Sequence, residues 1–387
     1  MTDWHNAGFG LYLHWPFCQT KCPYCDFNSH VATGIDQTRL KRAFLDELDH
    51  ASQGTDARVL NTVFFGGGTP SLMEPELVWA ILDKVRDIWR VDGSLEITLE
   101  ANPSSVEAGR FAGYRDAGVN RISMGIQALN DADLKKLGRL HSVTEARTAF
   151  DIARSVFDRV SFDLIYGRQN QNLSAWEDEL KQALNLAIDH LSLYQLTIEE
   201  NTVFADRHAA GKLHGLPDDA LAADMYLITQ EICDAAGFKG YEISNHARSG
   251  RESQHNLIYW RCGDYLGVGP GAHGRITDGN ARWAVETYRA PERWLSAVER
   301  DGMARSVQKR LPPREQAKEY LMMSLRLREG TDLKRLEKLD ANLIDFSTID
   351  HLEEKGLVSL SNDRARLKAT TQGRPVLNGI LRELMIA

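Results

Sequence analysis

The chain has 387 residues and a mass of 43.5 kDa, enough for one barrel-sized core and a smaller additional domain. Hydrophobic residues make up 43% and charged residues 26%, values typical of globular proteins that exclude a disordered or fibrous chain. The net charge of −8 and the isoelectric point near 5.9 exclude a general attraction to nucleic-acid backbones, so nucleic acid is not an expected partner.

The cysteines indicate a metal site rather than a disulfide framework. There are five, an odd number, and three lie between positions 18 and 25. Clustered free thiols are typical of a reducing compartment, so we expect a cytoplasmic protein. The N-terminus lacks a basic segment followed by an apolar run, and no window approaches 18 uninterrupted apolar residues, so we expect neither export nor a membrane span.

The first two hundred residues alternate between strand and helix patterns. Strands are predicted at 11–15, 59–65, 95–99, 121–126, 160–165 and 190–196. Helices are predicted at 37–52, 74–88, 106–117, 144–156 and 176–187. Six such units in series predict an α/β protein with a partial (β/α)6 barrel rather than a doubly wound sheet.

Cys18, Cys22 and Cys25 form a CxxxCxxC motif directly after the first predicted strand. Thiolates at this spacing wrap one metal centre. A closed structural zinc site is the alternative, but it needs four ligands, and neither a second CxxC pair nor a suitably spaced histidine is present. Three thiolates on a four-iron cluster leave one iron without a protein ligand, whereas electron-transfer clusters have four cysteines. The motif therefore predicts a cluster with an open iron.

Several polar or glycine-rich segments follow the next strands. They are GGGTP at 66–70, EANP at 100–103, Gln127 and, within the fifth strand, Asp163. In a βα barrel the C-terminal ends of the strands form the mouth of the site. Consecutive glycines allow a ligand to approach the backbone closely, so these segments are candidates for ligand binding.

The sequence predicts two further domains in the remainder of the chain. Residues 201–310 are less regular, with a helix at 218–236 and a segment rich in glycine and aromatic residues at 255–274, which we expect to be an ordered loop. Residues 311–387 predict a small winged-helix-like α+β domain, with helices at 314–328, 332–339 and 347–354 and a hairpin at 357–370. We therefore expect three domains, at 1–200, 201–310 and 311–387.

A winged helix raises the alternative of DNA binding. From residue 309 onward there are fifteen lysines and arginines against twelve acids, without a basic stripe, so the charge pattern argues against it.

These motifs resemble the radical SAM superfamily, whose members use the open iron of a [4Fe-4S] cluster to bind S-adenosylmethionine (SAM). YLHWPFCxxxCPYCDF, FFGGGTP, LEANP, RISMGIQ and FDLIYG are similar to the group that contains oxygen-independent coproporphyrinogen III oxidases and the heme chaperones of the HemW family. The resemblance covers nearly the whole chain. It implies that the three cysteines bind the cluster, and that the SAM contacts are Tyr12, Tyr24, Gly67, Gly68, Thr69, Glu100, Gln127, Arg139 and Asp163.

Three features favour the chaperones over the oxidases. The oxidases have a fourth cysteine two residues after the third, where this chain has Phe27, and they carry an N-terminal arm before the first strand. HNLIYW at 255–260 matches the HNxxYW motif of the chaperones. This implies His255 as an axial heme ligand and Tyr259 and Trp260 as ring contacts.

We therefore expect a heme chaperone that binds a [4Fe-4S] cluster, SAM and heme and transfers heme to acceptor proteins. The alternative is a radical enzyme that decarboxylates a tetrapyrrole, and a scaffold without ligands is a third reading. Cys262 and His273 are further candidate heme contacts, although loop packing is the favoured role for both, and Cys233 is expected in a helix core. The sequence leaves open whether SAM is cleaved, which residue is the second axial ligand and whether heme is attached covalently. It also leaves open the identity of the acceptor, contact with membrane-bound acceptors and a homodimer.

Overall fold

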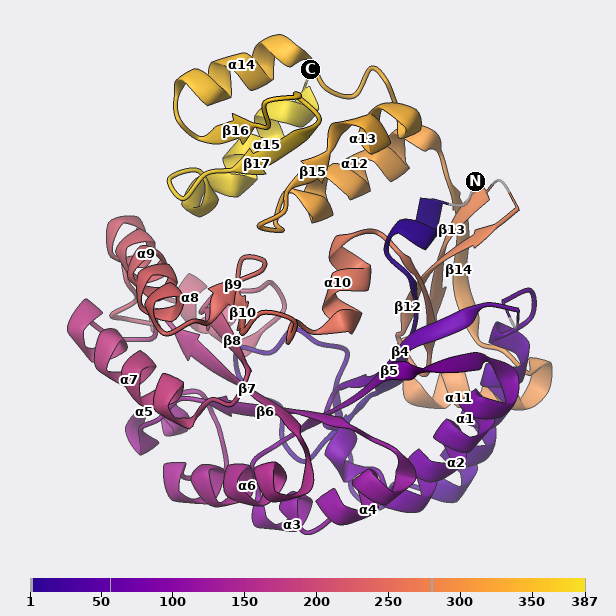
Figure 1. The fold of residues 1–387 in the computed structure, drawn as a ribbon. Coiled ribbons are helices and arrows are strands. Elements are labelled where there is room, and N and C mark those ends of the chain that lie inside the picture. Colours follow the sequence, from indigo (N-terminus) through magenta and orange to yellow (C-terminus); the bar gives the residue numbers. More distant parts are fainter. Residues whose placement is uncertain (1–2, 56, 280, 387) are drawn as a thin grey trace.

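A large curved sheet organises the molecule (Figure 1). The computed structural model describes residues 3–55, 57–279 and 281–386. Seven neighbouring strands of the sheet are parallel, in the order β11 (Asp264–Val268), β1 (Phe9–Trp15), β4 (Val59–Gly67), β5 (Arg90–Ala101), β6 (Arg121–Gln127), β7 (Arg159–Tyr166) and β8 (His190–Gln195). All six strands expected from the sequence are present in the expected order, and the α/β partial barrel is confirmed.

Helices cover the outer face of the sheet (Figure 1). They are α1 (Gln37–Ala51), α2 (Pro75–Ile88), α3 (Ser105–Ala108), α4 (Phe111–Ala117), α5 (Asp131–Lys136), α6 (Val143–Val156), α7 (Leu173–Leu186), α8 (Val203–Ala209) and α9 (Asp219–Ala235). The apolar faces of α1, α2, α6 and α7 pack on the strands to form the main core. The helix expected at 106–117 is divided into α3 and α4.

The expectation of an ordered loop at 255–274 was wrong. This segment forms helix α10 (Gln254–Trp260) and strand β11, which pairs in parallel with β1 and extends the barrel beyond its first strand. Glycine lowers strand propensity, yet Gly267 is required here because a Cβ atom would lie 2.1 Å from the carbonyl oxygen of His273. The glycines that suggested a loop therefore permit close strand packing.

Two antiparallel extensions complete the large sheet. On one edge lie β12 (His273–Asp278), β13 (Ala281–Thr287) and β14 (Arg305–Leu311), and α11 (Pro291–Asp301) connects the last two. On the other edge lie β9 (Lys239–Gly240) and β10 (Asn245–Ala247). In the described part of the chain, no helix is both long and apolar enough to cross a bilayer.

The C-terminal segment has its own hydrophobic core and the element order of a winged helix. Its elements are α12 (Pro313–Ser324), β15 (Thr331–Asp332), α13 (Leu333–Leu339), α14 (Phe346–Glu354), β16 (Val358–Leu360), β17 (Arg366–Ala369), a short 3-10 helix η3 (Arg374–Val376) and α15 (Leu377–Ile386). The segment lies over α9 and α10 (Figure 1). The exact domain boundaries stay a prediction.

Candidate functional site

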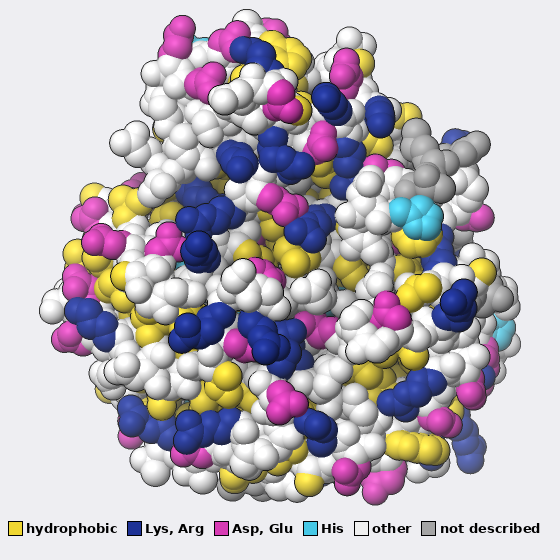
Figure 2. Space-filling view, in the orientation of Figure 1, with side chains coloured by type: hydrophobic (Ala, Val, Ile, Leu, Met, Phe, Trp, Pro, Cys, Tyr) yellow, Lys and Arg dark blue, Asp and Glu magenta, His cyan; other side chains and the backbone are white. Residues whose placement is uncertain are grey.

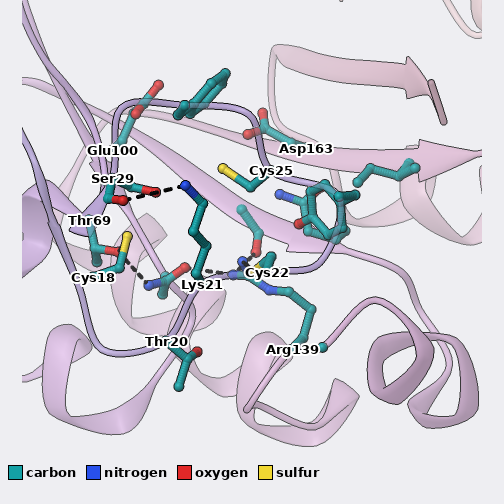
Figure 3. A pocket seen from close by; sticks show the side chains of 18 of the residues that line it. Cys18, Thr20, Lys21, Cys22, Cys25, Ser29, Thr69, Glu100, Arg139 and Asp163 are labelled. Carbon is teal, nitrogen blue, oxygen red and sulfur yellow. Dashed lines mark hydrogen bonds between the residues drawn. The ribbon is translucent and has the colours of Figure 1, made fainter. Parts of the chain in front are cut away.

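The three clustered cysteines lie in the loop that follows β1, and all three line one cavity of about 570 Å³ (Figure 3). A two-residue parallel pairing, Phe17–Cys18 with His30–Val31, closes the base of this loop. Burial raises the pKa of the Cys18 and Cys25 thiols above the usual range. Among the described residues, no group of three or more His, Cys, Asp and Glu side chains is arranged to hold a metal ion, so the expectation of a cluster rests on the spacing of the cysteines and on the cavity that they share.

The glycine segment at the end of β4 packs directly against the loop at 16–29 that carries the three clustered cysteines, which we call the cluster loop. The amide of Gly68 donates to the carbonyl of Trp15, and the amide of Thr69 donates to the carbonyl of Phe17. A Cβ atom on Gly68 would lie 2.6 Å from the Phe17 carbonyl oxygen, and Gly67 has a φ of +110°. Both positions therefore require glycine, because the backbones approach closely and one φ is left-handed.

A chain of hydrogen bonds connects two of the cysteines through the strand ends. Thr69 donates to the sulfur of Cys18 at 3.5 Å, and the Asn102 amide donates to Thr69 Oγ1 at 3.2 Å. Arg139 donates to Asn102 Oδ1 at 2.6 Å and to the sulfur of Cys22 at 3.4 Å. This network holds donors against two sulfur atoms, an arrangement suited to thiolates that carry negative charge.

Two half-buried carboxyl groups line the cavity, Glu100 near the end of β5 and Asp163 within β7. Burial, together with the charge of Asp163, raises the pKa of Glu100 to about 8, and the Gly67 amide donates to its carboxylate at 3.2 Å. Burial raises the pKa of Asp163 to about 6. The buried guanidinium of Arg121 opposes both shifts. The cavity thus offers two carboxyl groups that a cationic or hydroxyl-bearing ligand would satisfy.

Two further atoms of the cavity are suited to a polar ligand. Gln127 Oε1 and Arg139 Nε are buried without a hydrogen-bond partner among the described residues. Gln127 also has a φ of +75°, which is uncommon for a residue with a side chain. Buried polar groups are normally paired, so these atoms fit a polar molecule beside the cysteines.

The structure brings together most of the predicted SAM contacts. Tyr24, Gly67, Gly68, Thr69, Glu100, Gln127, Arg139 and Asp163 line the cavity with the cysteines, whereas Tyr12 does not. The Tyr12 hydroxyl lies 3.0 Å from His14 Nδ1 instead. Sequence reasoning missed Asn102 and Tyr194, which also line the cavity. The LEANP motif contained the first, but its link between Thr69 and Arg139 is visible only in three dimensions.

The HNxxYW motif forms α10, and its residues face two directions. Asn256, Tyr259 and Trp260 line a second cavity of about 770 Å³, which shares Tyr194 and Gln195 with the first. His255 is 1% exposed and faces the barrel, where its ring nitrogens lie 2.7 Å from the hydroxyls of Thr62 and Tyr259. Burial lowers the pKa of His255 to about 3, so the imidazole is neutral.

The secondary heme candidates lie elsewhere. Cys262 is buried with the C-terminal hydrophobic core, and His273 is exposed, 3.8 Å from Glu286. Neither lines the two cavities described here. Cys233 is fully buried in α9, as expected.

Comparisons with known proteins agree with these motifs. The radical SAM superfamily model matches residues 12–183, and the HemN C-terminal domain model matches 311–376. The chain is 44% identical to heme chaperone HemW of Escherichia coli, over 69% of this chain and 70% of the relative. It is 33% identical to HemW of Bacillus subtilis, over 95% and 97%.

A mitochondrial relative and a solved structure extend the similarity to nearly the whole chain. Radical S-adenosyl methionine domain-containing protein 1 of Bos taurus is 38% identical over 97% of this chain and 87% of the relative. The structure of coproporphyrinogen III oxidase (HemN) from Escherichia coli aligns with a TM-score of 0.80 at 22% identity, covering 98% of this chain and 90% of that chain. The latter shows a shared fold.

Proposed function

Since this chain belongs to the HemW family of the radical SAM superfamily, we propose that it is a heme chaperone that binds a [4Fe-4S] cluster, SAM and heme and passes heme to acceptor proteins. The observation that carries the proposal is the pair of adjoining cavities. One contains the cysteines and eight predicted SAM contacts, and the other is walled by the HNxxYW helix.

In the first cavity, Cys18, Cys22 and Cys25 would hold the cluster. When bound, the cluster would supply an iron without a thiolate ligand, which could bind SAM. Thr69 and Arg139 donate to two of the sulfurs and balance their charge. Glu100 suits the amino group of SAM. Gln127 and Asp163 suit the ribose hydroxyls, and Arg139 suits the carboxylate.

In the second cavity, Tyr259 and Trp260 present aromatic surface to a porphyrin. The imidazole of His255 is neutral, but both of its nitrogens are already hydrogen-bonded, Nε2 to Tyr259 and Nδ1 to Thr62. One of these hydrogen bonds must break before His255 can become an axial ligand. The proposal therefore includes a movement of α10 in which Tyr259 releases the imidazole when heme binds.

The competing function is oxidation of coproporphyrinogen III. Phe27 stands where the oxidases have a fourth cysteine, and its side chain is 57% exposed at the rim of the first cavity. Nothing at this position can supply a thiolate.

The proposal is tested with anaerobically reconstituted protein. We expect hemin titration to give a saturable Soret band, and incubation with coproporphyrinogen III and SAM to give no protoporphyrinogen. Turnover of coproporphyrinogen III, or a hemin spectrum that does not change on addition of protein, would refute the chaperone function.

Two matched variants test whether His255 is an axial ligand of heme. His255→Ala is expected to weaken and shift the Soret band, whereas His273→Ala, which removes an exposed histidine outside both cavities, should leave it unchanged. Identical spectra for wild type and His255→Ala would exclude His255 as the ligand.

A further inference from the structure

The second cavity lies between the barrel and the C-terminal domain, and both parts contribute to its walls. Tyr226 of α9 and Tyr259 and Trp260 of α10 line it from the barrel. Arg326, two residues after α12, and Arg374 of η3 line it from the C-terminal domain. Its volume of about 770 Å³ is within the range of cofactor sites in proteins.

The two arginines bond to neutral groups among the described residues. Arg326 donates to the Met322 carbonyl and to Asn378 Oδ1, and Arg374 donates to the carbonyls of Glu242 and Arg326. Arg328 and Arg335, by contrast, lie outside this cavity and pair with Asp234 and Asp3. Among the described residues neither of these half-buried guanidinium groups forms an ion pair with a carboxylate, although the charge of Glu242 acts on Arg326. Two such neighbouring cations at a cavity wall fit an anionic ligand.

Two acids also line the cavity. The Glu242 carboxylate accepts hydrogen bonds from the backbone amides of Ile243 and Ser244 and from Asn245, so it is already satisfied by donors of its own loop. Asp219 lies in the first turn of α9. Figure 2 shows lysine and arginine side chains along the join between the C-terminal lobe and the barrel.

We infer that this cavity is the heme site and that Arg326 and Arg374 bind the two propionate carboxylates, while Tyr259 and Trp260 contact the ring. The inference rests on the proposed function and adds the means by which the ligand is held. Because the C-terminal domain supplies both arginines, it is the part of the protein that binds the carboxylates of the ligand. Because Tyr194 and Gln195 border both cavities, heme placed here adjoins the SAM cavity.

The test compares hemin with hemin dimethyl ester, which has the same ring but no free carboxylates. Titrations of the reconstituted full chain are followed by absorbance, with both ligands in the same mild detergent. We expect wild type to prefer hemin. Arg326→Gln and Arg374→Gln should each weaken hemin binding by about tenfold, the usual value of a lost charge-assisted hydrogen bond, and leave ester binding unchanged.

Arg328→Gln is the matched control, because this neighbouring arginine is exposed and does not line the cavity. Arg374→Lys keeps the charge and should recover part of the hemin preference, which separates carboxylate binding from the structural bonds of Arg374. Unchanged hemin affinity in both glutamine variants, or an equal loss for hemin and ester, would overturn the inference and leave the chaperone function standing. Failure of wild type to bind either ligand would refute both.

Discussion

Glu100, a proposed SAM contact, lowers the stability of the folded protein at neutral pH. Its carboxyl group is buried near the carboxyl of Asp163, and these two causes raise its pKa from 4.5 to about 8. Between pH 4.5 and 8 the folded protein therefore binds a proton at Glu100 that the unfolded chain does not. The free energy of unfolding contributed by this residue falls as the pH rises through that interval.

Glu100→Gln removes the ionisable group and keeps the shape. We expect the variant to gain melting temperature relative to wild type as the pH rises from 5 to 8, because only in wild type does the unfolded chain release a proton that the folded protein retains. It should also bind SAM more weakly, since an amide cannot release a proton to become the carboxylate that would pair with the amino group. Thermal scans at several pH values without SAM measure the first effect, with the exposed Glu76→Gln as control. A melting-temperature difference that stays constant with pH contradicts the assigned pKa.

At the residue scale, the sequence predicted which residues belong to the site better than it predicted which residues they contact. The spacing of Cys18, Cys22 and Cys25 and the run of glycines at 66–68 are local patterns, so they were readable in one dimension. The role of Asn102 depends on β5 lying between the strand that carries Thr69 and the loop that carries Arg139. The orientation of His255 likewise depends on where α10 packs, which its six-residue motif does not encode.

At the element scale, the end of β4 and the cluster loop form one backbone unit. Gly68 and Thr69 donate to carbonyls of the loop, so the position of the cysteines depends on how closely β4 can approach. A side chain at position 68 would meet the Phe17 backbone rather than a flexible side chain, and neither can move without shifting Cys18.

Gly68→Ala is expected to displace the cluster loop. The iron content after anaerobic reconstitution should fall severalfold, while far-ultraviolet circular dichroism stays near that of wild type because, after β1, only Phe17 of this loop packs against the barrel core. Gly93→Ala is the matched control, since a Cβ atom there meets nothing within 4 Å. Full iron content in Gly68→Ala would show that the close approach is not required.

The element scale also explains why the segment 255–274 was misread. Alternation of helix and strand patterns identified the six βα units because each strand is long and buried, and each helix has one apolar face. Helix α10 has only seven residues. Strand β11 has five, and its buried positions alternate but include the charged Asp264, so its hydrophobic pattern is not clear in the sequence. Pairing with β1 and contact with the C-terminal domain stabilise them.

At the scale of the whole molecule, ion pairs fasten the C-terminal domain to the barrel. Arg335 of α13 donates to both carboxylate oxygens of Asp3 at 2.8 and 2.6 Å and to the carbonyl of Arg261 at 2.7 Å. Its guanidinium also lies 4.2 Å from the ring centre of Tyr320. This one side chain joins the N-terminal turn, the end of α10 and the domain that carries Arg326 and Arg374.

Arg335→Ala should therefore loosen the wall of the second cavity and spare the first. We expect the free energy of unfolding to fall by about 2 kcal/mol, since a partly buried guanidinium loses several charge-assisted hydrogen bonds. Hemin affinity should fall with it, and SAM affinity should not change, because the SAM cavity is built from strand ends and the cluster loop. Urea denaturation and two ligand titrations measure these three quantities.

Arg364→Ala is the control. It breaks an exposed ion pair within the same domain and should lower the free energy of unfolding by less than about 1 kcal/mol. Equal behaviour of the two variants would mean that Arg335 is only another surface charge, and an equal loss of SAM binding would mean that the two cavities are not separately supported.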